Sequence, residues 1–175
     1  MTVLVAFLRG VNLGKRKVLS ADLKHAFDAM GFSGARTLLA SGNVVFEAEE
    51  SPGLAARIEQ GLEQKFGFPI GVVLRSQEAL RAMIAADPFA AIPKDADAKL
   101  YVALLHDPVG GTLPKPLRAE GDFDVLSATD YDIFAVAWRM ADGRYGAGLD
   151  QIGKHFGKGV LITTRNWNTI LKAAD

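Results

Sequence analysis

Three short polar segments together contain Gly, Asn and basic side chains, which are residue types that proteins use to bind anions. They are residues 9–17, 41–43 and 163–168, and each adjoins a run of strand-forming residues. Glycine permits tight turns, backbone N–H groups in such turns can point at an anion, and guanidinium and ammonium groups supply positive charge. We therefore predict that the three segments line one shared, positively charged binding site.

The predicted site contains five basic side chains and three asparagines. Its members are Arg9, Asn12, Lys15, Arg16, Lys17, Asn43, Arg165 and Asn166. The basic residues would bind phosphate through charge-assisted hydrogen bonds, and the asparagines would orient it. Each segment also has a purely structural interpretation: a solvated basic loop, a hairpin turn, and an arginine paired with an acid. A polar network that locks two subdomains together is the structural alternative for the whole set.

No catalytic motif is recognisable in the chain. Residues 10–15 are one residue short of a nucleotide-binding phosphate loop, and Arg16 stands where Ser or Thr would bind Mg²⁺. The absence of cysteine excludes disulfides, thiolate catalysis and cysteine zinc sites, and the three histidines lack ligand spacing. Acidic pairs at 122/124 and 130/132 flank strand ends, where aspartate is a common turn residue. We predict no catalytic residue, no metal and no cofactor.

Composition indicates an ordinary globular protein. Of the 175 residues, 49% are hydrophobic and 23% are charged. Because 20 Lys and Arg balance 20 Asp and Glu, an anionic partner must be met by a local patch rather than by overall charge. The apolar run at 3–8 has its basic residues after it, unlike a signal peptide, and no run is long enough to span a membrane. We expect a cytoplasmic protein that does not bind membranes.

The first half of the chain shows a regular alternation of elements. Strands are expected at 3–8, 36–40, 43–48 and 70–75. Helices are expected from Ser20 to Gly31, from Ser51 to Gly67 and from Ser76 to just before Pro88. The serine is the expected N-terminal cap of each helix, and Gly31 is expected to end the first in a left-handed conformation. Phe46 is expected in the core rather than on a nucleic-acid-binding face. The order strand, helix, strand, strand, helix, strand is the split βαβ plan of ferredoxin-like domains.

The second half is predicted as a variant of the first. Residues 89–98 are interpreted as a linker. A strand is expected at 100–105, an antiparallel pair at 123–129 and 133–140, and a short helix at 150–156. A final helix is expected from about Thr164, with Trp167 as its packing anchor. The predicted fold is therefore α+β, with two ferredoxin-like subdomains that have antiparallel sheets, at 1–88 and 99–175.

The first strand is apolar on both faces. Residues 3, 5 and 7 face one side and residues 4, 6 and 8 the other, and all six are apolar. An isolated sheet with helices on one face should alternate apolar with polar residues. We expect the second face to be covered by the second half of the chain or by another chain, and a homodimer is therefore an open alternative.

Together, the three segments resemble a family of bacterial proteins catalogued as domain of unknown function 1697. Members open with an apolar strand running into Leu-Arg-Gly-Ile/Val-Asn-Val/Leu-Gly, continue with Ser-Gly-Asn-Val-Val-Phe, and finish with Thr-Thr-Arg-Asn-Trp-Asn-Thr. This chain matches at 8–14, 41–46 and 163–169. The resemblance implies an α+β fold of two ferredoxin-like parts and carries no reaction with it.

Three functions stay open at this point. The preferred hypothesis is a non-enzymatic protein that binds a phosphate-bearing small molecule or a nucleic-acid backbone at the basic site. The first alternative is an enzyme acting on a small anionic metabolite, which would show a pH–rate profile with a perturbed carboxylate. The second is a structural or dimerisation module without a ligand, for which apparent mass would change with concentration.

Overall fold

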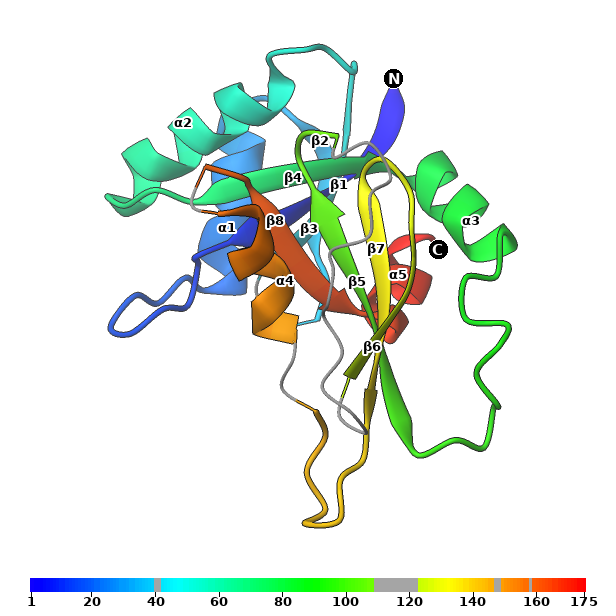
Figure 1. Cartoon of the computed structure of the whole chain (residues 1–175). Helices are drawn as coiled ribbons and strands as arrows, with labels where there is room; N and C mark the ends of the chain where they lie inside the picture. The colour runs from blue at the N-terminus through cyan, green and yellow to red at the C-terminus, as the bar shows by residue number, and fades with distance from the viewer. Residues whose placement is uncertain (40–41, 109–122, 147–148, 158) are drawn as a thin grey trace. The chain divides into compact units, whose positions relative to one another are not determined.

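The computed structural model describes residues 1–39, 42–108, 123–146, 149–157 and 159–175 (Figure 1). Its elements are β1 (Thr2–Arg9), α1 (Ser20–Ala29), β2 (Ser33–Thr37), β3 (Asn43–Ala48), α2 (Leu54–Phe66), β4 (Gly71–Ser76), α3 (Gln77–Ala85), β5 (Ala98–Leu105), β6 (Phe123–Ala128), β7 (Asp132–Trp138), α4 (Leu149–Phe156), β8 (Ile162–Asn166) and α5 (Trp167–Ala173). They form two four-stranded antiparallel sheets, so the predicted α+β class is confirmed.

The chain divides into two compact units. Unit 1 comprises Met1–Arg81 and Leu171–Asp175, and unit 2 comprises Ala82–Ile170. The chain therefore leaves unit 1 within α3 and returns to it within α5. Among the described residues, no helix has the length and apolar character needed to cross a membrane.

The sheet of unit 1 has the strand order β2-β3-β1-β4. β1 pairs with β3 on one side, where Val5 lies opposite Val45, and with β4 on the other, where Val5 lies opposite Arg75. A central strand is the place for an apolar sequence, because both of its neighbours and both faces shield it from water. Val5 and Phe7 are fully buried, as are Ala6 and Leu4 on the opposite face of β1.

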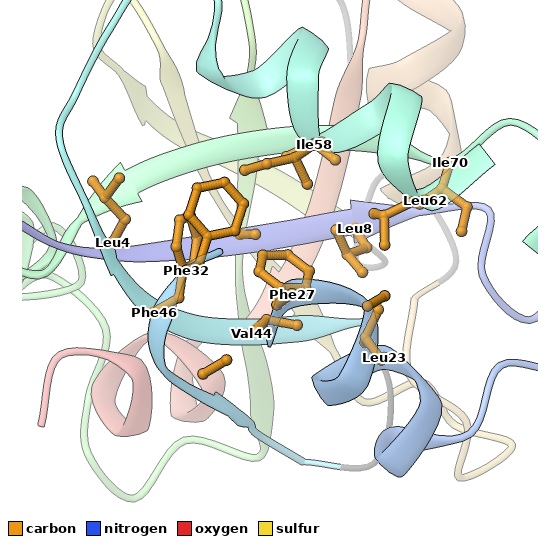
Figure 2. Packing of buried hydrophobic residues seen from close by; sticks show 14 of the residues in the cluster. Leu4, Leu8, Leu23, Phe27, Phe32, Val44, Phe46, Ile58, Leu62 and Ile70 are labelled. Carbon is orange, nitrogen blue, oxygen red and sulfur yellow. The ribbon is translucent and has the colours of Figure 1, made fainter. Parts of the chain in front are cut away.

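Helices α1 and α2 pack on one face of this sheet. The core between them contains alternate residues of β1 and β3 together with the apolar stripes of both helices (Figure 2). Its centre is an aromatic trio in which the Phe46 ring lies 5.1 Å from Phe27 and 4.9 Å from Phe32. Phe46 is fully buried, which confirms the prediction that it belongs to the core.

The helix ends follow the sequence signals only in part. Gly31 has φ +87° and the Phe32 amide donates to the Phe27 carbonyl, which is the predicted left-handed end of α1. Ser76 caps α3 as predicted, since its hydroxyl accepts the Ala79 amide at 3.0 Å. The predicted caps of α1 and α2 are wrong. Neither N-terminus has a side-chain cap hydrogen bond, and α2 begins after Gly53 rather than at Ser51.

The sheet of unit 2 has the order β6-β7-β5-β8. β5 is central and pairs with β7 and with β8, for example Val102 opposite Phe134 and opposite Arg165. Its core joins alternate residues of β5 and β7 to Phe123 of β6 and Ile152 of α4. Matched strand by strand, with β5 in the place of β1, this order is the same as that of unit 1.

The predicted start of the last helix is wrong. Residues 163–166 belong to strand β8, and α5 begins at Trp167. Thr163 and Thr164 pair with Leu104 and Ala103 of β5, and β-branched residues suit that extended position better than a helix start. Trp167 packs against Phe89 with ring centroids 5.0 Å apart, which agrees with its predicted role as a packing anchor.

Candidate functional site: a basic loop after β1

The first polar segment forms a closed loop, residues 10–19, which we call the β1–α1 loop. Gly10 and Gly14 adopt φ of +86° and +60°, a region that glycine enters without strain. The side-chain oxygen of Asn12 accepts the Val18 amide at 3.3 Å, so Asn12 ties the two sides of the loop together. The backbone path of this loop is thus set by its glycines and by Asn12.

The loop exposes three consecutive cations. Lys15, Arg16 and Lys17 are all exposed, and within the described ranges none of them has an acidic partner. The guanidinium carbon of Arg16 lies 4.7 Å from the centre of the Phe68 ring, a cation–π contact that orients the group without neutralising it. The result is a local concentration of positive charge on a protein whose formal net charge is zero.

The second polar segment lies beside the end of β1. The Leu8 amide donates to the Gly42 carbonyl at 2.8 Å, and Asn43 pairs with Phe7. Asn43 is only 4% exposed, and its side-chain amide donates to the Leu38 carbonyl at 3.2 Å. Its hydrogen bonds therefore shape the β2–β3 connection, of which residues 40–41, including Ser41, lie outside the described residues.

The third segment lies in unit 2. The Arg165 guanidinium donates to the Thr163 hydroxyl at 2.6 Å and to the Thr164 carbonyl at 2.9 Å, and burial lowers the pKa of Arg165 to about 10. Asn166 accepts the Asn168 amide at 2.9 Å, which forms a turn at the start of α5. This arginine is partly buried in a sheet, in contrast to the exposed cations of the β1–α1 loop.

The structure thus groups six of the eight predicted site residues in unit 1. Arg9 at the end of β1, the β1–α1 loop and Asn43 belong to adjoining segments of that unit. Arg165 and Asn166 are brought together in unit 2. Within the described residues, no cluster of three or more His, Asp or Glu could hold a metal ion.

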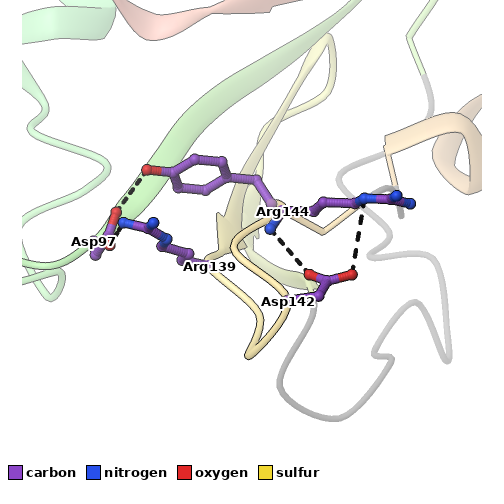
Figure 3. A network of polar contacts seen from close by, with 5 residues as sticks. Asp97, Arg139, Asp142 and Arg144 are labelled. Atoms are coloured by element: carbon purple, nitrogen blue, oxygen red, sulfur yellow. Dashed lines mark hydrogen bonds and ion pairs between the residues drawn. The ribbon is translucent and has the colours of Figure 1, made fainter.

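A polar network in unit 2 was not anticipated from the sequence (Figure 3). The Asp97 carboxylate accepts a hydrogen bond from the Tyr145 hydroxyl at 2.6 Å and from the Arg139 guanidinium at 2.9 Å. Lys99 lies over the Tyr145 ring at 4.5 Å. The hydrogen bond from Tyr145 lowers the pKa of Asp97 most, and the hydrogen bond from Arg139 is the next largest cause. The same hydrogen bond to Asp97 raises the pKa of Tyr145. No local sequence pattern links residues this far apart in the chain.

Replacing Asp97 by Asn is expected to lower the thermal midpoint at neutral pH. Because the pKa of Asp97 is lower in the folded chain, its stabilising contribution is present above the ordinary value of 3.8 and is lost as pH falls through the folded value. The difference in thermal midpoint between wild type and Asp97→Asn should therefore disappear below about pH 4. Thermal unfolding measured over a range of pH follows this difference. Asp95→Asn, an exposed neighbour, serves as control, and a gap that persists at about pH 2 would contradict the linkage.

Comparison with known proteins places the chain among others of the same fold. A family model described as "Protein of unknown function (DUF1697)" matches residues 1–134. The solved structure of a conserved bacterial protein from Streptococcus pneumoniae aligns with a TM-score of 0.73 at 21% identity, covering 99% of this chain and 97% of that chain. At that identity the likeness shows the fold alone. No curated protein matches the chain.

Proposed function

The chain belongs to the family described as protein of unknown function (DUF1697), and from this premise we propose that it is a non-enzymatic protein that binds the phosphate backbone of single-stranded nucleic acid through its β1–α1 loop. The observation that carries the proposal is the run of three exposed cations, Lys15 to Lys17, without acidic partners in the part of the chain that the structure describes. Cations without acidic partners attract polyanions, because binding releases the counterions condensed on the polyanion.

A polymeric ligand suits this loop better than a single small metabolite. An exposed ion pair in water contributes only about 0–1 kcal/mol, so one phosphate held at an open loop would bind weakly. A nucleic-acid strand presents phosphates in series, and several can contact neighbouring cations at the same time. Weak single contacts then add up to measurable affinity, and counterion release contributes with each contact.

The remaining predicted residues take supporting roles in this proposal. Arg9 extends the basic surface from the end of β1, while Asn12 and Asn43 hold the backbone that presents the cations. Arg165 and Asn166 are proposed as a further contact for the same ligand. The strand orders β2-β3-β1-β4 and β6-β7-β5-β8 support assigning both units to the ferredoxin-like plan, with unit 2 as a variant of unit 1.

The proposal is tested by fluorescence-anisotropy titration with labelled short single-stranded RNA and DNA over a range of salt concentrations. Wild type should bind saturably and more weakly as salt increases. Each phosphate contact adds about −0.7 to the slope of log affinity against log salt, so a Lys15→Gln, Arg16→Gln, Lys17→Gln triple variant should lose about 2 units of slope. Its affinity at low salt should fall at least about tenfold.

A charge-matched variant distinguishes binding at the β1–α1 loop from a general effect of the protein's net charge. Lys65→Gln, Lys154→Gln and Lys172→Gln remove the same three charges from exposed helix positions and should leave affinity within about twofold. Equal weakening by both triple variants, or no binding to either nucleic acid at low salt, would refute the proposal. Circular dichroism should show that both variants remain folded, because every substituted side chain is exposed.

A further inference from the structure

A pocket of about 310 Å³ lies within unit 2, next to the beginning of β5. Its lining includes four large apolar side chains and two charged ones, namely Phe89, Ile92, Leu100, Trp167, Asp87 and Lys94. A volume at the small end of the range for ligand pockets has room for one ring and a short polar group. Apolar walls with a few polar groups are the usual composition of a small-molecule site.

One wall of the pocket is a stretch of successive turns in the segment that the sequence suggested as a linker. Hydrogen bonds of 3.0–3.1 Å close these turns, from Ala90 to the Asp87 carbonyl, from Ile92 to the Phe89 carbonyl and from Ala96 to the Pro93 carbonyl. Asp87 adopts φ +48°, a left-handed conformation that non-glycine residues rarely hold. Aspartate is one of the few non-glycine residues that enter this region readily, so it suits the turn at this position.

Two of the lining side chains, Phe89 and Trp167, are aromatic. Phe89 meets Trp167 at 5.0 Å and Phe134 at 5.9 Å between ring centroids, both in edge-on arrangements that fix the rings. Trp167 is partly exposed, and its indole N–H makes no hydrogen bond to the residues that the structure describes. A flat apolar surface with an available donor is suited to a planar ligand that carries an acceptor.

The two charged side chains of the pocket have opposite signs. Asp87 and Lys94 are both exposed, and neither forms an ion pair with any described residue. A carboxylate and an ammonium beside one apolar pocket can each pair with the opposite charge on a bound molecule. The long, flexible stem of the lysine lets its charge reach a ligand that the aspartate already holds.

We propose that this pocket binds a small zwitterion with one aromatic group, of the chemical class of the free aromatic amino acids. The ring packs on Phe89 and Trp167, the ligand carboxylate accepts hydrogen bonds from Lys94 and the indole N–H, and its ammonium donates to Asp87. This is a second site, built from other residues than those of the β1–α1 loop, and it stands or falls independently of nucleic-acid binding.

Tryptophan fluorescence provides the test. The chain has two tryptophans, so Trp138→Phe leaves Trp167 as the only emitter, and calorimetry on the wild-type chain guards against an effect of that substitution. Titration with L-phenylalanine should give a saturable change. The probes 3-phenylpropionate and phenethylamine, which each lack one charge, should bind about tenfold more weakly, and L-alanine should give no response.

Two variants test which charge of the ligand pairs with Lys94 and which pairs with Asp87. Lys94→Met should weaken L-phenylalanine about tenfold yet leave phenethylamine unchanged, and Asp87→Asn should weaken L-phenylalanine yet leave 3-phenylpropionate unchanged. No saturable response to L-phenylalanine in either assay would overturn the proposal. So would 3-phenylpropionate binding as tightly as L-phenylalanine, or binding that neither variant alters.

Discussion

Replacing Phe46 by Ala is expected to lower the free energy of unfolding of unit 1 by about 3–5 kcal/mol. The side chain is fully buried and lies 4.9–5.1 Å, ring centre to ring centre, from Phe32 and Phe27. The substitution removes its buried apolar area and leaves a cavity that the strand and helix backbones around it cannot close. It also removes two aromatic contacts, each of which adds about 0.5–1.5 kcal/mol to burial alone.

Denaturant unfolding followed by far-ultraviolet circular dichroism measures this effect. Phe66→Ala at the end of α2 is the matched control, because that ring is only partly buried, and its loss should be about 1 kcal/mol. Because the chain has two compact units, each unfolding transition is fitted by itself. A loss below about 1 kcal/mol for Phe46→Ala would mean that the aromatic trio is not the centre of this core.

Replacing Arg165 by Met is expected to raise the free energy of unfolding by about 1 kcal/mol. Burial lowers the pKa of this guanidinium to about 10, so the folded chain disfavours the charged form by about 3 kcal/mol. Methionine keeps an unbranched side chain of similar length without the charge. The gain is reduced by the lost hydrogen bonds to Thr163 and Thr164, which contribute about 1 kcal/mol each.

The pH dependence has a defined sign. The folded pKa of Arg165 lies below the unfolded one, so the penalty is fully present below about pH 10 and is relieved as the pH rises above that value. The stability advantage of Arg165→Met over wild type should therefore shrink as the pH rises above about 10. Arg36→Met, at an exposed position in β2, is the control and should change stability by no more than about 0.5 kcal/mol.

The outcome for Arg165 also separates two explanations of the polar segments. If a polar network locks the fold, Arg165→Met should destabilise the chain, because buried partners would lose their donor. If the arginine serves to bind a ligand, the variant should be more stable and should bind nucleic acid more weakly. Such a trade-off between stability and function is common at binding sites. A destabilised variant with unchanged binding would favour the structural explanation.

Much of the fold was predictable because its signals are local. Apolar runs and helical spacing located most strands and helices, and Gly31 and Gly67, both with positive φ, mark helix ends. The strand predicted at 36–40 lies earlier, at Ser33–Thr37. The start of the last helix was not predicted, because Thr164 can cap a helix as well as lie in a strand. Pairing with β5 decided between the two, and that pairing joins residues about sixty apart in the chain.

By itself, the sequence determined the α+β class, the family and the run of basic residues after β1, since each depends on neighbouring residues. Tertiary structure alone decided that Asn12 and Asn43 hold backbone, that Arg165 carries a desolvated charge, and that Asp97 meets Tyr145. It also turned the expected linker into a pocket wall. The physical reason is that hydrogen bonding, desolvation and cavities depend on groups brought together from distant parts of the chain, for which local sequence carries no signal.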